Sequence, residues 1–240
     1  MPSLICWPLL LIRRRKRKTI TTFSRHQFRK CPNLIKDLTP LRPNQVWVAD
    51  ITYWFTEYGW LYISLLTDAY SHRIMGFAVA ETLATVHCRG ALEMALRQIT
   101  KRAGRQLIHH SDRGIQSCSQ EYLAPLAAWH VQVSMTERSD PLENPVAERI
   151  NGILKQEYLS HQPVRSLDEA QQHLERAVFL YNYKRPHLSC NYQSPDEAHH
   201  SWGPLERRWK NYYKPPVSDG PKVSNFRTST ETVNADPDYH

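Results

Sequence analysis

From residue 45 onward, the pattern of apolar and polar positions divides the chain into short strands and longer helices. Runs rich in β-branched and aromatic side chains predict strands, because those side chains fit a pleated, half-buried surface. Gly59 and a polar turn at 68–72 separate the first three runs, which predicts an antiparallel meander. The three strands are expected at 46–54, 61–67 and 73–80.

Helical periodicity begins after the third strand. Apolar residues recur every three or four positions over 85–101, and Gly104 closes this stretch. Strands are then expected at 106–110 and 131–135, and helices at 119–129, 145–159 and 166–183. Asn144 is the expected N-cap of the helix at 145–159, and Ser166 with Glu169 predicts a capping box for the next one. The predicted fold class is α/β: a mixed five-stranded sheet, with three antiparallel strands followed by alternating helices and strands, flanked by helices.

Composition divides the 240 residues into three parts. Residues 1–43 form a basic, proline-punctuated arm and lead-in, which we expect to be the remainder of a truncated upstream region. Residues 44–200 carry the regular pattern and form the folded core with its C-terminal helix. Residues 201–240 begin with interleaved aromatic and basic residues and continue, from about 215, as a Pro-, Ser- and Thr-rich tail that we expect to be disordered.

Two further features bear on the compartment. The apolar run at 4–12 is too short to span roughly 30 Å of hydrocarbon, and its positive charges follow it instead of preceding it as in a secretory signal. We therefore expect no membrane segment. The five cysteines are scattered without a CxxC pair, and no set of His and Cys has the spacing of a zinc site. These features favour a reducing, cytoplasmic location.

Positive charge is concentrated at the start of the chain. Residues 1–49 hold eleven Lys and Arg residues against one acidic residue, Asp37, so their net charge is +10. The remaining 191 residues carry −2, within a total of +8. A basic arm on a nearly neutral body is typical of a protein that binds a polyanion, because each Lys or Arg placed on a phosphate releases condensed counterions. A solvated charged run is the alternative.

Three carboxylates occupy positions that call for an explanation. Asp50 lies inside an apolar strand, Asp112 follows the strand at 106–110, and Glu148 lies near the start of the helix at 145–159. Singly, they could be an edge residue, a turn residue and a solvated helix residue. Together they offer hard oxygen ligands of the kind that Mg²⁺ prefers. The intervals are 61 residues between Asp50 and Asp112 and 35 between Asp112 and Glu148.

The residues around these acids carry a family resemblance. The matching strings are NQVWVADITY at 44–53, HHSDRGIQ at 109–116, DPLENPVAER at 140–149, and YNYKRPH at 181–187, which is followed by Ser194 and Pro195. In these strings and in the order and spacing of its acids, the chain resembles the DDE transposases and retroviral-type integrases. Within them it is similar to the retrovirus-like, two-frame transposases of bacterial insertion sequences. The resemblance covers about residues 13–214.

The resemblance implies a ribonuclease-H-like integrase catalytic core within 44–200. It implies DNA transposition and integration by Mg²⁺-dependent phosphodiester hydrolysis and strand transfer at the ends of an insertion sequence. Asp50, Asp112 and Glu148 would be the catalytic residues and would hold two Mg²⁺ ions, with Mn²⁺ as a substitute. Two such ions, about 3.5 to 4 Å apart, stabilise both the attacking and the leaving oxygen of an in-line displacement.

DNA contacts are expected from the same helix and from the arm. Seven residues of helix turn by about 700°, which leaves Lys155 on the same side as Glu148, two turns along, and Asn151 at i+3 shares that side. Lys155 is expected to contact a phosphate, although ordinary helix surface is its alternative. The expected contacts in the arm are Arg13, Arg14, Arg15, Lys16, Arg17 and Lys18.

The implied partners are DNA, as transposon ends and target, and further copies of the chain in a homo-oligomer on that DNA. Helix-turn-helix material of the kind that accompanies these transposases is missing ahead of the arginine run, so a companion helix-turn-helix protein from an upstream frame is a further expected partner. The location would be the bacterial cytoplasm, at the nucleoid. Two other functional classes stay open: a catalytically silent DNA-binding remnant of a decayed element, and a general Mg²⁺ nuclease of the ribonuclease H type.

The arm yields the first testable prediction. If residues 13–18 track phosphates, deletion of residues 1–18 weakens binding to unrelated DNA sequences about equally, because phosphate contacts carry no base information. Loss of six basic contacts flattens the slope of log K against log salt by at most about 5 units. Binding of two unrelated duplexes over a range of salt concentrations measures this. An unchanged slope would make the run a solvated segment, and a loss confined to one duplex would show that the arm reads bases.

Overall fold

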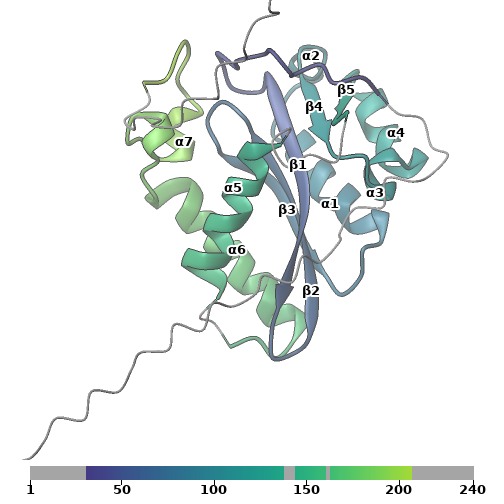
Figure 1. Cartoon of the computed structure of the whole chain (residues 1–240), viewed down its shortest axis with the longest axis vertical. Helices are drawn as coiled ribbons and strands as arrows, with labels where there is room; N and C mark the ends of the chain where they lie inside the picture. Colours follow the sequence, from purple (N-terminus) through teal and green to yellow (C-terminus); the bar gives the residue numbers. More distant parts are fainter. Residues whose placement is uncertain (1–30, 138–143, 161–162, 207–240) are drawn as a thin grey trace, which may run out of the picture. The chain divides into compact units, whose positions relative to one another are not determined.

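The computed structural model describes residues 31–137, 144–160 and 163–206 (Figure 1). The basic run at 13–18 and the tail after 215 lie outside these residues, so the expectations for them stay predictions. Among the described residues, no helix combines the length and the apolar character needed to cross a bilayer.

A mixed sheet of five strands forms the centre of the fold, in the order β3-β2-β1-β4-β5. Strand β1 pairs antiparallel with β2, and β2 pairs antiparallel with β3, while β4 runs parallel to β1 and β5 runs parallel to β4. The strands are β1 (Val46–Phe55), β2 (Trp60–Asp68), β3 (Ile74–Ala80), β4 (Ile108–Ser111) and β5 (Gln132–Met135). The predicted sheet, with its antiparallel meander and two later strands, is confirmed.

Helices connect and cover the strands. Their bounds are α1 (Thr85–Leu96), α2 (Lys101–Gly104), α3 (Ile115–Cys118), α4 (Gln120–Ala128), α5 (Pro145–Ile153), α6 (Leu167–Lys184) and α7 (Pro195–Ala198). The π-helical turn η2 (Leu154–Leu159) continues α5, and the 3₁₀ turn η3 (Leu188–Cys190) follows α6. The single helix predicted over 85–101 is two helices, because the Thr100 side chain caps a new one by accepting the backbone N–H of Ala103.

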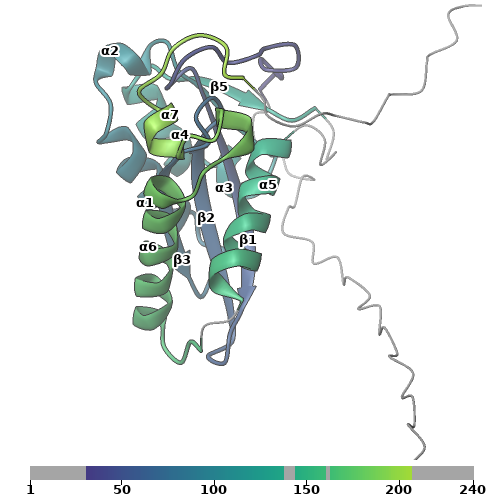
Figure 2. The ribbon, with the colours of Figure 1, turned by 90° about the vertical axis from the view of Figure 1, so that its left-hand side faces the viewer.

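Apolar side chains divide between the two faces of the sheet. On one face, Leu61, Ile63 and Leu65 of β2 pack with α5 and α6, and on the other, Trp47 and Leu66 pack with α1 and α4. Figures 1 and 2 show these two helix layers on opposite sides of the strands. Alternate residues of a strand point to opposite faces, so a sheet covered on both sides needs the near-continuous apolar runs that the sequence has.

The expected capping box of α6 forms only in part. The Ser166 hydroxyl accepts the N–H of Glu169 at 3.1 Å, as predicted. The Glu169 carboxylate, however, accepts the N–H of Arg165 at 2.8 Å, one residue earlier than a capping box requires. The helix therefore begins where the pattern places it, with a shifted second hydrogen bond.

Gly76 of β3 marks a close approach between the sheet and α1. A Cβ at this position would collide with the backbone carbonyl of Ala91 and lie 3.2 Å from the Ala95 Cβ. Gly76→Ala is expected to lower the free energy of unfolding by about 2 to 3 kcal/mol, because helix backbone cannot move aside as a flexible side chain can. Urea denaturation measures this difference.

Gly90→Ala is the matched control, since Gly90 lies on α1 with no atom within 4 Å of the added Cβ. This variant is expected to gain up to about 1 kcal/mol from improved helix propensity. Equal effects of the two substitutions would contradict the packing of β3 against α1.

Candidate active site

The parallel pairing of β1 with β4 brings two of the three predicted acids to one place. Val48 pairs with His110 in this ladder. Asp50 follows two residues after Val48 on β1, and Asp112 follows two residues after His110, directly past Ser111, the last residue of β4. Parallel strands end at the same edge, so the register places Asp50 beside the loop that carries Asp112. Both residues also line a small cavity together with Ser117 and Tyr122.

The Asp50 carboxyl group is partly buried and held by two hydrogen bonds. Its Oδ1 accepts the N–H of Ile51 at 2.9 Å, and its Oδ2 accepts the Asn151 amide N–H at 2.6 Å. Burial, followed by the negative charge of Asp112 and then that of Glu148, raises the pKa of Asp50 to about 7. The two hydrogen bonds act in the opposite direction and stabilise the ionised form. Asp50 therefore experiences the charge of both other predicted acids.

Helix α5 carries the third acid and is fastened along β1 by polar contacts. The Asn144 side chain donates to the carbonyl of Ala49 at 3.1 Å, just ahead of the helix. Asn151 donates to Asp50 from the same helix. Glu148 lies between these two contacts, in the first turn of α5, and its side chain is exposed.

Asn144 does not cap α5 through its side chain, as the sequence analysis expected. Its amide instead reaches across to β1, while its backbone carbonyl accepts the N–H of Glu148 at 3.3 Å. Asn144 is therefore the N-cap residue, as predicted, but its side chain bonds to β1 instead of to the first N–H groups of the helix, because the carbonyl of Ala49 lies within reach of the amide.

Lys155 lies one turn beyond Asn151, on η2, and contacts β1. Its Nζ donates to the Thr52 hydroxyl at 2.9 Å and lies 4.6 Å from the centre of the Tyr53 ring. Burial lowers its pKa, and the neighbouring Tyr53 and Asp50 partly offset that effect. Lys155 and Asn151 thus both face β1, and the predicted contact of Lys155 with DNA stays a prediction.

The donor set formed by Asp50, Asp112 and Glu148 suits a hard divalent cation. All of its ligand atoms are carboxylate oxygens, and their mutual repulsion is visible in the raised pKa of Asp50. In addition, the carbonyl oxygen of the Asn151 amide is buried beside this group without a partner among the described residues. These three acids therefore fit a Mg²⁺ site better than a zinc site.

Comparison with known proteins identifies the fold of this chain. Two family models, both described as "Integrase core domain", match residues 40–141 and 130–195. The catalytic core domain of HTLV-2 integrase in complex with magnesium superposes with a TM-score of 0.53 at 19% identity, over 68% of this chain and all of that one. A chain of the simian T-cell lymphotropic virus intasome, in complex with PP2A regulatory subunit B56 gamma, superposes with a TM-score of 0.57 at 19% identity, over 83% of this chain and 66% of that one. The fold is thus the ribonuclease-H-like fold of the retroviral integrase cores.

Proteins of similar sequence identify the family to which the chain belongs. The chain is 38% identical over 185 residues to the uncharacterized 31 kDa protein of insertion element IS600 from Shigella sonnei, which covers 76% of this chain and 67% of that protein. It is 36% identical over 162 residues to a putative transposase of element IS986/IS6110 from Mycobacterium tuberculosis, covering 66% of this chain and 58% of the relative. The chain belongs to the DDE transposase and retroviral-type integrase family, among the transposases of bacterial insertion sequences.

The raised pKa of Asp50 leads to a stability prediction. Between the unfolded pKa of 3.8 and the folded pKa of about 7, the folded state binds more protons than the unfolded state, so its stability falls as pH rises through this window. Asp50→Asn removes this loss. Its advantage over the parent protein is expected to grow from pH 4 to pH 8 by up to about 4 kcal/mol. Urea denaturation in EDTA at a series of pH values measures the difference.

Asp37→Asn, which removes an exposed carboxyl group, is the control for the loss of one acidic side chain. The buried Asp68, whose pKa is raised to about 6 by burial, is present in all three proteins and cancels in the comparison. A constant difference between Asp50→Asn and the parent protein across the pH range would show that Asp50 titrates normally.

Proposed function

We propose that the chain catalyses DNA transposition by metal-dependent phosphodiester hydrolysis followed by strand transfer at the ends of an insertion sequence. The observation that supports this most directly is that the charges of Asp112 and Glu148 both act on the Asp50 carboxyl group, which lies beside the edge between β1 and β4, although the carboxylate oxygens of the three acids do not all lie within 4.8 Å of one another. Family membership supports the same chemistry. Because the relatives are longer than the matched region, the activity of the chain by itself is part of the proposal.

The proposed cofactor is a pair of Mg²⁺ ions, with Mn²⁺ as a substitute, held by Asp50, Asp112 and Glu148. Bound there, the ions would activate a water or a DNA 3′-hydroxyl and stabilise the leaving oxygen. The oxygen-only donor set supports this assignment, as does the magnesium named for the HTLV-2 integrase core. Asp50 takes the central role, since its carboxyl group lies within the electrostatic reach of both other acids.

Neighbouring residues orient this group. Asn151 holds one oxygen of Asp50 at 2.6 Å and thereby fixes the carboxyl plane. Lys155 is anchored on Thr52, two residues beyond Asp50, so its charge stays beside the acids where a phosphate would bind. Glu148 lies exposed in the first turn of α5, and its negative charge acts on the Asp50 carboxyl group. We propose DNA contacts for Lys155, for Asn151 and for the basic run from Arg13 to Lys18.

The proposed partners are the transposon ends and target DNA, further copies of the chain in a homo-oligomer on that DNA, and a companion helix-turn-helix protein from an upstream frame. Dimeric and trimeric forms are named for the HTLV-2 integrase core, which supports assembly of this chain as well. The proposed location is the bacterial cytoplasm, at the nucleoid, where these partners are found.

Substitution of each acid tests the function. Asp50→Asn, Asp112→Asn and Glu148→Gln are each expected to reduce Mg²⁺-dependent cleavage of a duplex carrying the element's end by at least about 1,000-fold, because each removes a metal ligand from the transition state. DNA binding is expected to stay within a few-fold of the parent protein, since the phosphate-binding bases remain. Cleavage and strand transfer are followed on labelled duplexes, and binding is followed by electrophoretic mobility.

Asp37→Asn and Glu175→Gln, both exposed and distant in sequence from the three acids, serve as charge-matched controls. Residual cleavage by any acid variant within a few-fold of the parent would overturn the assignment of that residue. Hydrolysis without any strand transfer to a second duplex would favour the general nuclease. DNA binding without either reaction would favour the silent remnant.

A further inference from the structure

A second group of metal-binding side chains lies away from the three acids. His72 stands in the turn between β2 and β3, while His187 and Cys190 belong to the segment around η3, after α6. One ligand atom from each lies within 4.8 Å of the other two. Within the described ranges, this is the one such group of three that the His, Cys, Asp and Glu side chains form.

Packing and hydrogen bonds hold the two segments together at this point. The rings of His72 and His187 are stacked, with 4.7 Å between their centres and 24° between their planes. The Cys190 thiol donates to the carbonyl of Ser71 at 3.4 Å, and the Tyr181 hydroxyl donates to the carbonyl of His72 at 3.1 Å. His72 itself has a left-handed backbone, with φ of 61°, which turns its side chain toward the η3 segment. The arrangement is therefore fixed by several contacts that do not involve the ligand atoms of the two histidines.

His187 has a buried ring nitrogen available to a ligand. The residue is 7% exposed, and its Nε2 has no hydrogen-bond partner among the described residues. Its Nδ1 accepts the N–H of Ser189 at 3.3 Å, a long bond. A metal on Nε2 would shift the imidazole proton to Nδ1 and break this bond, whereas a metal on Nδ1 would replace it. The route through Nε2 satisfies the buried nitrogen at the cost of one weak hydrogen bond, whereas the route through Nδ1 costs the same bond and leaves the Nε2 N–H without an acceptor, so Nε2 is the favoured ligand atom.

The charges around the group are compatible with a divalent cation. Burial, and then the negative charge of the fully buried Asp68, raise the pKa of the Cys190 thiol to about 12, so the thiolate forms only when a cation binds it. A thiolate and the Asp68 carboxylate together would balance two positive charges. Arg185 and Arg149 lie near His187 and oppose a cation. The Arg185 guanidinium, however, is paired with Glu157 through two hydrogen bonds of 2.7 and 2.8 Å, which offsets its charge.

We propose that His72, His187 and Cys190 bind one Zn²⁺ ion. Two imidazole nitrogens and one thiolate sulfur form the borderline-soft donor set that zinc prefers over Mg²⁺. In a tetrahedral site with bonds of about 2.0 to 2.3 Å, neighbouring ligand atoms are roughly 3.5 Å apart, so only about 1 Å of side-chain movement closes the group from 4.8 Å. On binding, the thiol proton of Cys190 leaves to solvent and a Zn–S bond forms; no redox step is involved.

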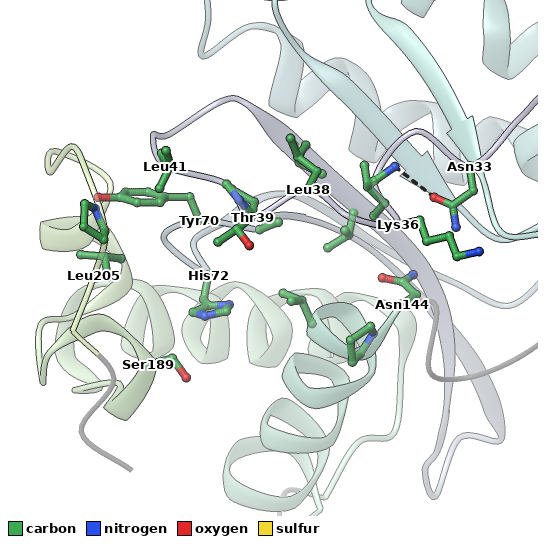
Figure 3. Close-up of a pocket in the computed structure, with 18 residues that line it drawn as sticks. Asn33, Lys36, Leu38, Thr39, Leu41, Tyr70, His72, Asn144, Ser189 and Leu205 are labelled. Atoms are coloured by element: carbon green, nitrogen blue, oxygen red, sulfur yellow. Dashed lines mark hydrogen bonds between the residues drawn. The ribbon is translucent and has the colours of Figure 1, made fainter. Parts of the chain in front are cut away.

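The fourth coordination position would be taken by water from the neighbouring pocket. His72 and Ser189 line this pocket of about 420 Å³, whose other walls include Tyr70 and Asn144 (Figure 3). The ion would link the segment after α6 to the β2–β3 turn. These two segments, which hold residues 190 and 72, are far apart in sequence. Its role is therefore to stabilise the fold, through ligands separate from the three acids of the proposed transposition chemistry.

Cobalt substitution tests the site directly. The metal-stripped full chain is titrated with Co²⁺, and we expect one equivalent to produce tetrahedral d–d absorption together with a thiolate-to-cobalt charge-transfer band, both abolished by Zn²⁺. Cys190→Ser is expected to remove the charge-transfer band and to weaken Co²⁺ binding at least about 100-fold, since loss of an outer-sphere partner alone costs 10- to 100-fold. A band in the parent protein that survives in Cys190→Ser would overturn the proposal, as would the absence of any band in the parent.

Controls separate this site from other thiols and from the acids. Cys6→Ser/Cys31→Ser, which removes two cysteines outside the group, is expected to keep the full spectrum, and so is Asp50→Asn. The second of these also separates the two proposals, because it abolishes DNA cleavage if the three acids act as proposed. Loss of the band in the cysteine control would assign the thiolate elsewhere and refute the site.

Thermal unfolding covers the case in which Cys190→Ser does not fold. His72 is partly exposed with a positive φ, which Asn tolerates, so His72→Asn is expected to fold. At Zn²⁺ concentrations about 100 times its dissociation constant, the parent protein is expected to melt several degrees higher than in EDTA, because the three ligands are brought together in the folded state and zinc binds that state more tightly than the unfolded chain. His72→Asn is expected to lose most of this shift. An equal shift in both proteins would refute the site.

Discussion

Burial of the Asp50 carboxyl group in the central strand is the constraint on which the candidate active site depends. A carboxylate at this position loses hydration and faces two other negative charges, so the fold is less stable with Asp50 ionised. The site offsets this cost locally with the N–H of Ile51 and the Asn151 amide. The latter bond also docks α5 on β1, and α5 carries Glu148. One hydrogen bond thus positions two acids at once, and a divalent cation would remove the remaining repulsion.

Much of the fold follows from local pattern. The antiparallel meander, the two later strands and the helix starts at Thr85, Pro145 and Leu167 lie within a residue or two of their predicted places, because apolar alternation and capping residues act over a few positions. The break after Leu96 was missed, because Thr100 could continue the pattern as well as cap a new helix. The π-helical turn from Leu154 was missed as well, since no residue there departs from helical periodicity.

Side-chain partners across elements were harder to predict. Helical spacing predicts that Asn151 and Lys155 lie on the Glu148 side of the helix. It does not predict that Asn151 contacts Asp50 and that Lys155 contacts Thr52 on β1. Which strand residue an amide reaches depends on how far α5 slides along the sheet, and helix periodicity carries no information on that. The proposed zinc ligands were harder still to predict from the sequence. More than 100 residues separate His72 from His187 and Cys190, so no local spacing identifies the group. Only the packing of α6 and η3 on the β2–β3 turn brings them together.

The two groups of ligands differ in the donor atoms they offer, and this difference lets them act separately. Carboxylates attract hard ions such as Mg²⁺, which keep part of their hydration and exchange readily with substrate phosphate. Imidazole and thiolate select zinc, which takes a closed tetrahedral set of nitrogen and sulfur ligands and suits a fixed structural link. An ion of the second kind at His187 and Cys190 would therefore hold the end of α6 in place without competing for Asp50. Because α6 packs on the same face of the sheet as α5, a firmly held α6 would in turn limit the sliding of α5 along β1 and keep Glu148 in register with Asp50.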